Sequence, residues 1–87
     1  MMIDTSLYTQ EELGIFALFS YRCAKCGESA VTLHEIVPKS KRPKTWNEPS
    51  NRIPLCNKCH NFCHARGAKR VRDELRQLRY HSKYYNH

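Results

Sequence analysis

Two cysteine pairs of identical spacing constrain this chain more than any other feature. Cys23 and Cys26 form one CxxC pair, Cys56 and Cys59 form the other, and residues 27–55 separate them. Two such pairs can place four thiolates tetrahedrally around one zinc ion, at about 2.3 Å each. A chain of 87 residues builds only a small core. We therefore expect zinc to act as the staple that holds the fold together.

The same four cysteines could instead form two disulfides or remain inert buried thiols. The start of the chain lacks the basic and apolar segments of a signal peptide. A helix needs about 20 apolar residues to cross a bilayer, and no apolar stretch of this sequence is that long. We therefore expect a cytoplasmic protein, whose paired cysteines more often bind metal than each other. A closed four-cysteine site has no open coordination position, so we assign it no catalysis. The remaining Cys63 is interpreted as a small buried hydrophobe.

Local patterns predict a small α+β domain. Thr9 and Glu12 fit a capping box that starts a helix running to about Ser20. The chain is then divided, within a single domain 1–87, into an N-terminal helical cover (1–22), a zinc-knuckle core (23–65) and a basic helical extension (66–87). The other predicted elements are a strand in 31–37, a basic, proline-broken loop at 38–50, a short strand at 51–55, a helix from Asn57, a break at Gly67, a helical stretch 68–83 and a frayed tail 84–87.

Three histidines suggest a second metal site. His60 and His64 are four residues apart on a predicted helix, so both rings project from one face. His34, on the strand before the loop, is the candidate third ligand. Three protein ligands leave positions open for water and substrate, which is the pattern of a catalytic metal site. The alternative is that these histidines are surface residues or hydrogen-bonding partners.

The segment "LHEIVPKS", followed by "NRIPLCNKCHNFCH", resembles HNH endonucleases of the ββα-metal type with an embedded CxxC…CxxC zinc site. The resemblance covers residues 23–64 and extends to phage and mobile-element nucleases, which would place the protein in the cytoplasm of a bacterial host. It implies a ββα-metal (HNH) core, flanked here by an N-terminal helix and a C-terminal basic helix. It also implies hydrolysis of DNA phosphodiester bonds to 5′-phosphate and 3′-hydroxyl ends.

The resemblance also assigns roles to individual residues. It implies that His34, His60 and His64 hold one divalent cation. It places Asn51 at the motif asparagine, which in the family fixes the loop that orients the general base; the alternative is a plain turn residue. A three-histidine site favours Zn, Ni, Co or Mn over Mg, which prefers oxygen ligands.

Glu35 departs from the family pattern, because it occupies the position where the general base is usually a histidine. A carboxylate, with a reference pKa of about 4.3, is a weaker base than imidazole. A nearby divalent cation lowers the pKa of bound water, which could compensate. The alternatives are that Glu35 is a solvated strand residue and that His34 takes the role of the base.

The charge distribution indicates a polyanionic partner, for which we expect double-stranded DNA. The net charge is +7, and residues 22–87 hold all fifteen lysines and arginines. Trp46 could stack on a base or simply be packed. Two other functions remain open: a non-catalytic zinc-containing DNA-binding module, and a zinc-stapled protein-interaction domain. The predicted phosphate contacts are Lys39, Lys41, Arg42 and Lys44 in the loop, and Arg66, Lys69, Arg70, Arg72, Arg76 and Arg79 in the C-terminal helical region.

Overall fold

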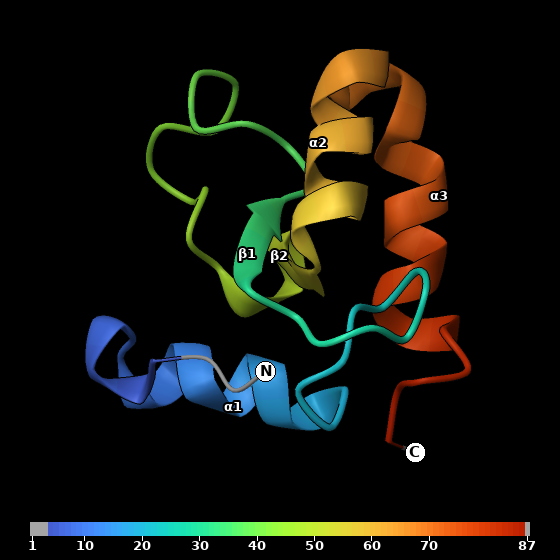
Figure 1. Ribbon diagram of the computed structural model, residues 1–87. Helices are drawn as coiled ribbons and strands as arrows, with labels where there is room; N and C mark the ends of the chain where they lie inside the picture. Colours follow the sequence, from blue (N-terminus) through green and yellow to red (C-terminus); the bar gives the residue numbers. More distant parts are fainter. Residues whose placement is uncertain (1–3, 87) are drawn as a thin grey trace.

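A two-stranded antiparallel sheet lies at the centre of the fold, and three α-helices surround it (Figure 1). The computed structural model describes residues 4–86. The helix α1 runs beneath the sheet, whereas α2 and α3 stand side by side as a helical hairpin. The prediction of a small α+β domain is thus confirmed. The elements are η1 (Thr5–Leu7), α1 (Gln10–Leu18), β1 (Thr32–Glu35), η2 (Pro49–Asn51), β2 (Arg52–Leu55), α2 (Asn57–Arg66) and α3 (Ala68–His81).

The first helix starts at the capping box predicted from the sequence. The Thr9 hydroxyl accepts a hydrogen bond from the Glu12 backbone N–H at 3.1 Å, and the Glu12 carboxylate accepts one from the Thr9 N–H at 2.8 Å. These bonds satisfy two donors that a helix start would leave unpaired. The helix ends at Leu18 because Ser20 and Tyr21 adopt left-handed backbone angles, with φ of 53° and 60°. The chain therefore turns away about two residues before the predicted end.

The two strands pair from Thr32 with Leu55 to Glu35 with Arg52. Successive side chains on a strand point to opposite faces of the sheet. Leu33 accordingly packs in the hydrophobic cluster that contains residues of α1, whereas the ring of His34 meets the histidines of α2. The sheet is therefore covered by α1 on one face and by α2 on the other.

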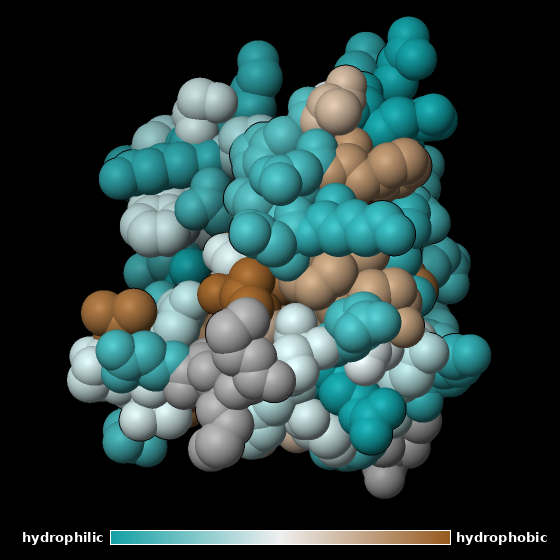
Figure 2. Space-filling view, in the orientation of Figure 1, coloured by the Kyte–Doolittle hydropathy of each residue, from teal (hydrophilic) through white to brown (hydrophobic). Residues whose placement is uncertain are grey.

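The hairpin of α2 and α3 turns at Gly67, where the predicted break occurs. Gly67 has a φ of 94°, a region that residues with a side chain rarely adopt. In α3, Val71, Leu75 and Arg79 are buried, and their four-residue spacing places them on one face. On the face shown in Figure 2, hydrophilic residues predominate at the top of the molecule, with a few moderately hydrophobic residues among them.

The C-terminal tail is ordered against the body, so the prediction of a frayed tail is wrong for residues 84–86. The Asn86 backbone N–H donates to the Leu18 carbonyl at 2.7 Å, and its side-chain amide donates to the Ala17 carbonyl at 3.0 Å. These carbonyls belong to the last turn of α1, where helix carbonyls lack the usual partner, and that of Ala17 also accepts from the Ser20 N–H at 3.0 Å. Tyr84 and Tyr85 pack on the main hydrophobic cluster. Residue 87 lies outside the described part of the chain.

We predict that Gly27 and Tyr84 are sterically coupled. A Cβ built on Gly27 overlaps the Tyr84 ring, and Gly27 also has a φ of +82°. Gly27→Ala should therefore lower the free energy of unfolding through both the clash and the backbone angle. In a Tyr84→Ala background the clash disappears, and the loss should be smaller by about 1–3 kcal/mol, the usual range for overpacking.

Denaturant unfolding of the four proteins in this double-mutant cycle measures the coupling. Gly67→Ala is the matched control, because a Cβ there meets nothing within 4 Å. Its loss should be the same in both backgrounds. If Gly27→Ala lowered the free energy of unfolding equally with and without the Tyr84 ring, the C-terminal tail would not pack on the turn at Gly27.

Candidate metal centres

Four cysteine sulfur atoms converge, two from the loop before β1 and two from the start of α2. The thiols of Cys23, Cys26, Cys56 and Cys59 all lie within 4.8 Å of one another. The Cys26 and Cys56 sulfurs are 3.5 Å apart, and two sulfurs bonded to one tetrahedral zinc would be about 3.8 Å apart. The four cysteines could therefore hold a structural metal such as zinc.

The chain positions these thiols through a loop and a helix cap. Cys56 caps the start of α2, and its sulfur accepts a hydrogen bond from the Cys59 N–H at 3.4 Å. Burial raises the pKa of Cys59, and the neighbouring thiols of Cys56, Cys23 and Cys26 raise it further, because both disfavour a thiolate there. A bound cation would reverse this effect by favouring the deprotonated form. All five cysteines are free thiols, and Cys63 is buried in the same hydrophobic cluster, as expected.

The three predicted histidines also lie together. One ring nitrogen from each of His34, His60 and His64 falls within a group whose members are all within 4.8 Å of one another. Nδ1 of His34 is 3.1 Å from Nδ1 of His60, and Nε2 of His60 is 3.1 Å from Nε2 of His64. Two nitrogens bound to one tetrahedral ion would be about 3.3 Å apart. A single ion would take one nitrogen from each ring, so His60 would use one of its two.

A pocket of about 250 Å³ opens beside this histidine cluster. His34 is buried, His60 is half-buried and His64 is exposed, so one side of the cluster faces solvent. Burial, together with the charges of His60 and His64, lowers the pKa of His34 to about 4, and burial also lowers the pKa of His60. Neutral imidazole is the form that binds metals. The pocket is lined by Leu33, His34, Glu35, Pro38, His60, Cys63, His64 and Ala68.

Two features of the cluster depart from a fully supported metal site. The Nε2 atom of His34 is buried and has no hydrogen-bond partner among residues 4–86, whereas metal-bound histidines usually donate this N–H to an acceptor. Glu35 lines the pocket but lies outside the ligand group, and its carboxylate accepts a hydrogen bond from the Lys39 N–H at 3.3 Å. The two residues are adjacent on β1, so their side chains leave the strand on opposite faces.

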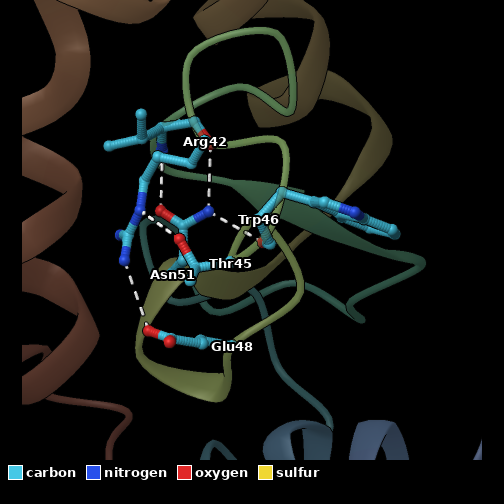
Figure 3. Close-up of polar contacts among 6 residues, drawn as sticks. Arg42, Thr45, Trp46, Glu48 and Asn51 are labelled. Atoms are coloured by element: carbon cyan, nitrogen blue, oxygen red, sulfur yellow. Dashed lines mark hydrogen bonds and ion pairs between the residues drawn. The ribbon is translucent and has the colours of Figure 1, made fainter.

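Asn51 closes the long loop that follows β1 (Figure 3). Its side-chain oxygen accepts from the Val37 N–H at 2.8 Å, and its amide nitrogen donates to the carbonyls of Val37 at 2.9 Å and Trp46 at 2.8 Å. Asn51 is only 2% exposed, so water does not compete for these bonds. One side chain thus joins the two ends of the loop to its middle, which is more than a plain turn residue does. We call this arrangement the Asn51 clasp.

Some of the residues predicted to contact phosphate are exposed, whereas others are half-buried or already bonded to neighbouring side chains. Arg42 is half-buried: its guanidinium donates to the Thr45 hydroxyl at 2.9 Å and contacts the Glu48 carboxylate at 3.3 Å (Figure 3). Arg72 is also half-buried. The exposed members of the predicted set are Lys39, Lys41, Lys44, Arg66, Lys69, Arg70 and Arg76.

Arg79 is not available to bind phosphate, which corrects its place in the predicted set. It is 3% exposed, and its guanidinium donates to the backbone carbonyls of Pro49 and Arg52. Its spacing of four and eight residues from Leu75 and Val71 carried a signal for this, because such positions share a helix face. Sequence analysis also did not single out Arg52, which forms an ion pair with Glu12 at 2.6 Å and joins β2 to α1.

Comparisons with family models, curated proteins and solved structures found no match to this chain. The likeness to HNH endonucleases therefore rests on the motif residues alone. Within residues 4–86, no helix has the length and apolar character needed to span a membrane.

We predict that the four-cysteine site supports the fold. Cys59→Ser removes one of four thiols, so zinc content, measured by elemental analysis, should fall towards zero and the cooperative thermal transition should collapse. Cys63→Ala is the control, because Cys63 lies on the same helix but outside the four-thiol group. It should retain the metal. A folded, metal-free Cys59→Ser protein would contradict the prediction.

Proposed function

We propose that the protein is a metal-dependent endonuclease that hydrolyses DNA phosphodiester bonds. The observation that carries the proposal is the convergence of His34, His60 and His64 beside a pocket that solvent can reach. Three neutral nitrogen ligands with an open side are typical of catalytic metal sites, whereas structural sites are closed. Imidazole ligands suit Zn, Ni, Co and Mn better than Mg.

The groups around the pocket suit a phosphodiester. A divalent cation there would supply Lewis-acid stabilisation of the phosphate and of the leaving oxygen. Lys39 follows Pro38 at one side of the pocket, and Arg66, Lys69 and Arg70 flank Ala68 at another. Exposed cations of this kind bind DNA phosphates without selecting sequence. The basic groups would therefore position the backbone, and the histidine cluster would mark the bond that is cut.

Glu35 is the proposed general base. Glu35 is one of the residues that line the pocket, and the Lys39 N–H donates a hydrogen bond to one of its carboxylate oxygens. The second oxygen would accept the proton of the attacking water. Because Glu35 lies outside the ligand group, a second function also has support: a zinc-containing module that binds DNA without cutting it.

A cleavage assay with two histidine variants tests the proposal. The protein, freed of loosely bound metal, is incubated with plasmid DNA while Mg, Mn, Ni, Co or Zn is added back separately. His64→Ala removes one ligand, so cleavage should fall by orders of magnitude while DNA binding and structural zinc change little. His81→Ala, an exposed histidine at the end of α3, is the control and should cut normally. If the unmodified protein cuts DNA with none of these metals, the binding module is the correct function.

Glu35→Gln tests the base separately from the metal. It keeps the size and most hydrogen bonding of the side chain but removes its basicity. We expect cleavage to fall by about 10²- to 10⁴-fold. An equilibrium titration should show that the histidine cluster still binds its divalent cation. Normal cleavage by Glu35→Gln, together with an inactive His34→Ala, would transfer the role of the base to His34 or to bound water.

A further inference from the structure

Trp46 occupies a fixed position with an accessible ring. Its backbone carbonyl belongs to the Asn51 clasp, and its indole points away from the other clasp residues (Figure 3). The residue is half-buried, and among residues 4–86 it belongs to neither hydrophobic cluster. The sequence contains no other tryptophan. An aromatic ring that lies outside the core, on a backbone that the clasp holds, is suited to contact a ligand.

A hollow of about 370 Å³ lies against this ring. Glu11 and Glu12 line the hollow with Trp46, and the only cation in the lining, Arg52, is already paired with Glu12 at 2.6 Å. Its lining therefore repels a phosphate but accepts a neutral, planar ring that can stack on the indole. The Asn47 amide in the same lining offers both a donor and an acceptor to the edge of such a ring. Thr9 completes the lining.

Lys39 contacts one lining residue of each hollow. Its backbone N–H bonds to Glu35, which lines the histidine pocket, and its ammonium lies 4.9 Å from the centre of the Trp46 ring. Lys39 is exposed, so its ammonium can move from the ring to a phosphate without breaking buried contacts. Arg52, 5.6 Å from the ring centre, is held in place by Glu12. Lys39 could therefore hold a DNA phosphate while a base of the same strand stacks on Trp46.

We propose that Trp46 is a stacking platform for an unpaired nucleobase, so that single-stranded or locally unpaired DNA is the preferred ligand of this site. The proposal rests on the proposed function only in taking DNA as the ligand, and it does not require cleavage. A base inside a duplex is stacked on both faces, so it must be unpaired or flipped to reach the ring. Base–aromatic stacking tolerates any sequence, because every base has a π-face.

The single tryptophan makes the test direct. Trp46 fluorescence is followed, without added divalent metal, while the protein is titrated with single-stranded oligothymidylate. The matched ligand is an oligomer with the same number of phosphates in which every base is replaced by an abasic spacer. We expect quenching by oligothymidylate and none by the spacer oligomer, because only the former can stack. A fully paired duplex should quench less than the single strand.

Two aromatic variants separate stacking from charge. Trp46→Ala should weaken oligothymidylate binding, measured by fluorescence anisotropy of labelled DNA, by about 5- to 100-fold, the range for loss of one base–aromatic stack. Its affinity for the spacer oligomer should not change. Phe62→Ala is the control: Phe62 is an exposed aromatic that also lies beside two cations, Lys25 and Arg66, but outside the Trp46 hollow. It should bind both ligands like the unmodified protein.

Equal quenching by the two ligands, or an equal loss of affinity for both on Trp46→Ala, would overturn the stacking proposal. Loss of base-dependent binding in Phe62→Ala instead of Trp46→Ala would overturn it as well. The outcome is independent of the nuclease proposal. DNA cleavage without base-dependent quenching would overturn the stacking proposal and support the nuclease proposal. Base-dependent quenching without cleavage under any metal would support the stacking proposal and overturn the nuclease proposal.

Discussion

The convergence of four thiols at the start of α2 is the contact on which the other parts of this fold depend. Cys56 directly follows β2 and Cys59 directly precedes His60, so the cluster fixes both the end of the sheet and the first turn of the helix. The other two thiols come from the loop before β1. Because a small core gives marginal stability, a metal held at this point would decide whether α2 keeps its place against β1. That placement brings His60 and His64 to His34.

The second constraint is the Asn51 clasp, which α3 stabilises through Arg79. The guanidinium of Arg79 donates to the carbonyls of Pro49 and Arg52, on either side of Asn51 in sequence. No carboxylate pairs with this buried charge among residues 4–86, and one of its nitrogens has no partner there. The rings of Phe19 and Tyr80, with centres 5.8 and 4.9 Å away, add cation–π contacts. Arg79 thus acts in the structure as a support of the loop and not as a surface charge.

The clasped loop contributes lining residues to two chemically different hollows. The histidine pocket is lined by groups that can bind a cation, whereas the hollow at Trp46 is lined by two carboxylates and an arginine that one of them neutralises. Lys39 contacts both sides, through its backbone and its side chain respectively. A phosphate and its neighbouring base could therefore be recognised separately on one short segment of chain. The exposed lysines of the loop would add affinity that depends on salt but not on sequence.

The sequence by itself determined the features that depend on local spacing. The CxxC pairs, the Thr9–Glu12 capping box, the i, i+4 separation of His60 and His64 and the break at Gly67 all follow from residues close together in the chain. Only the tertiary structure decided which distant groups meet. It placed Glu35 outside the ligand group, buried Arg79 under the loop, and ordered the tail through bonds from Asn86 to the end of α1. The reason is physical: Arg79 and Asn86 bond to backbone carbonyls of other elements, and the packing of separate elements sets the positions of these carbonyls. The helix spacing of Arg79 indicated which face it shares, but not which carbonyls it meets.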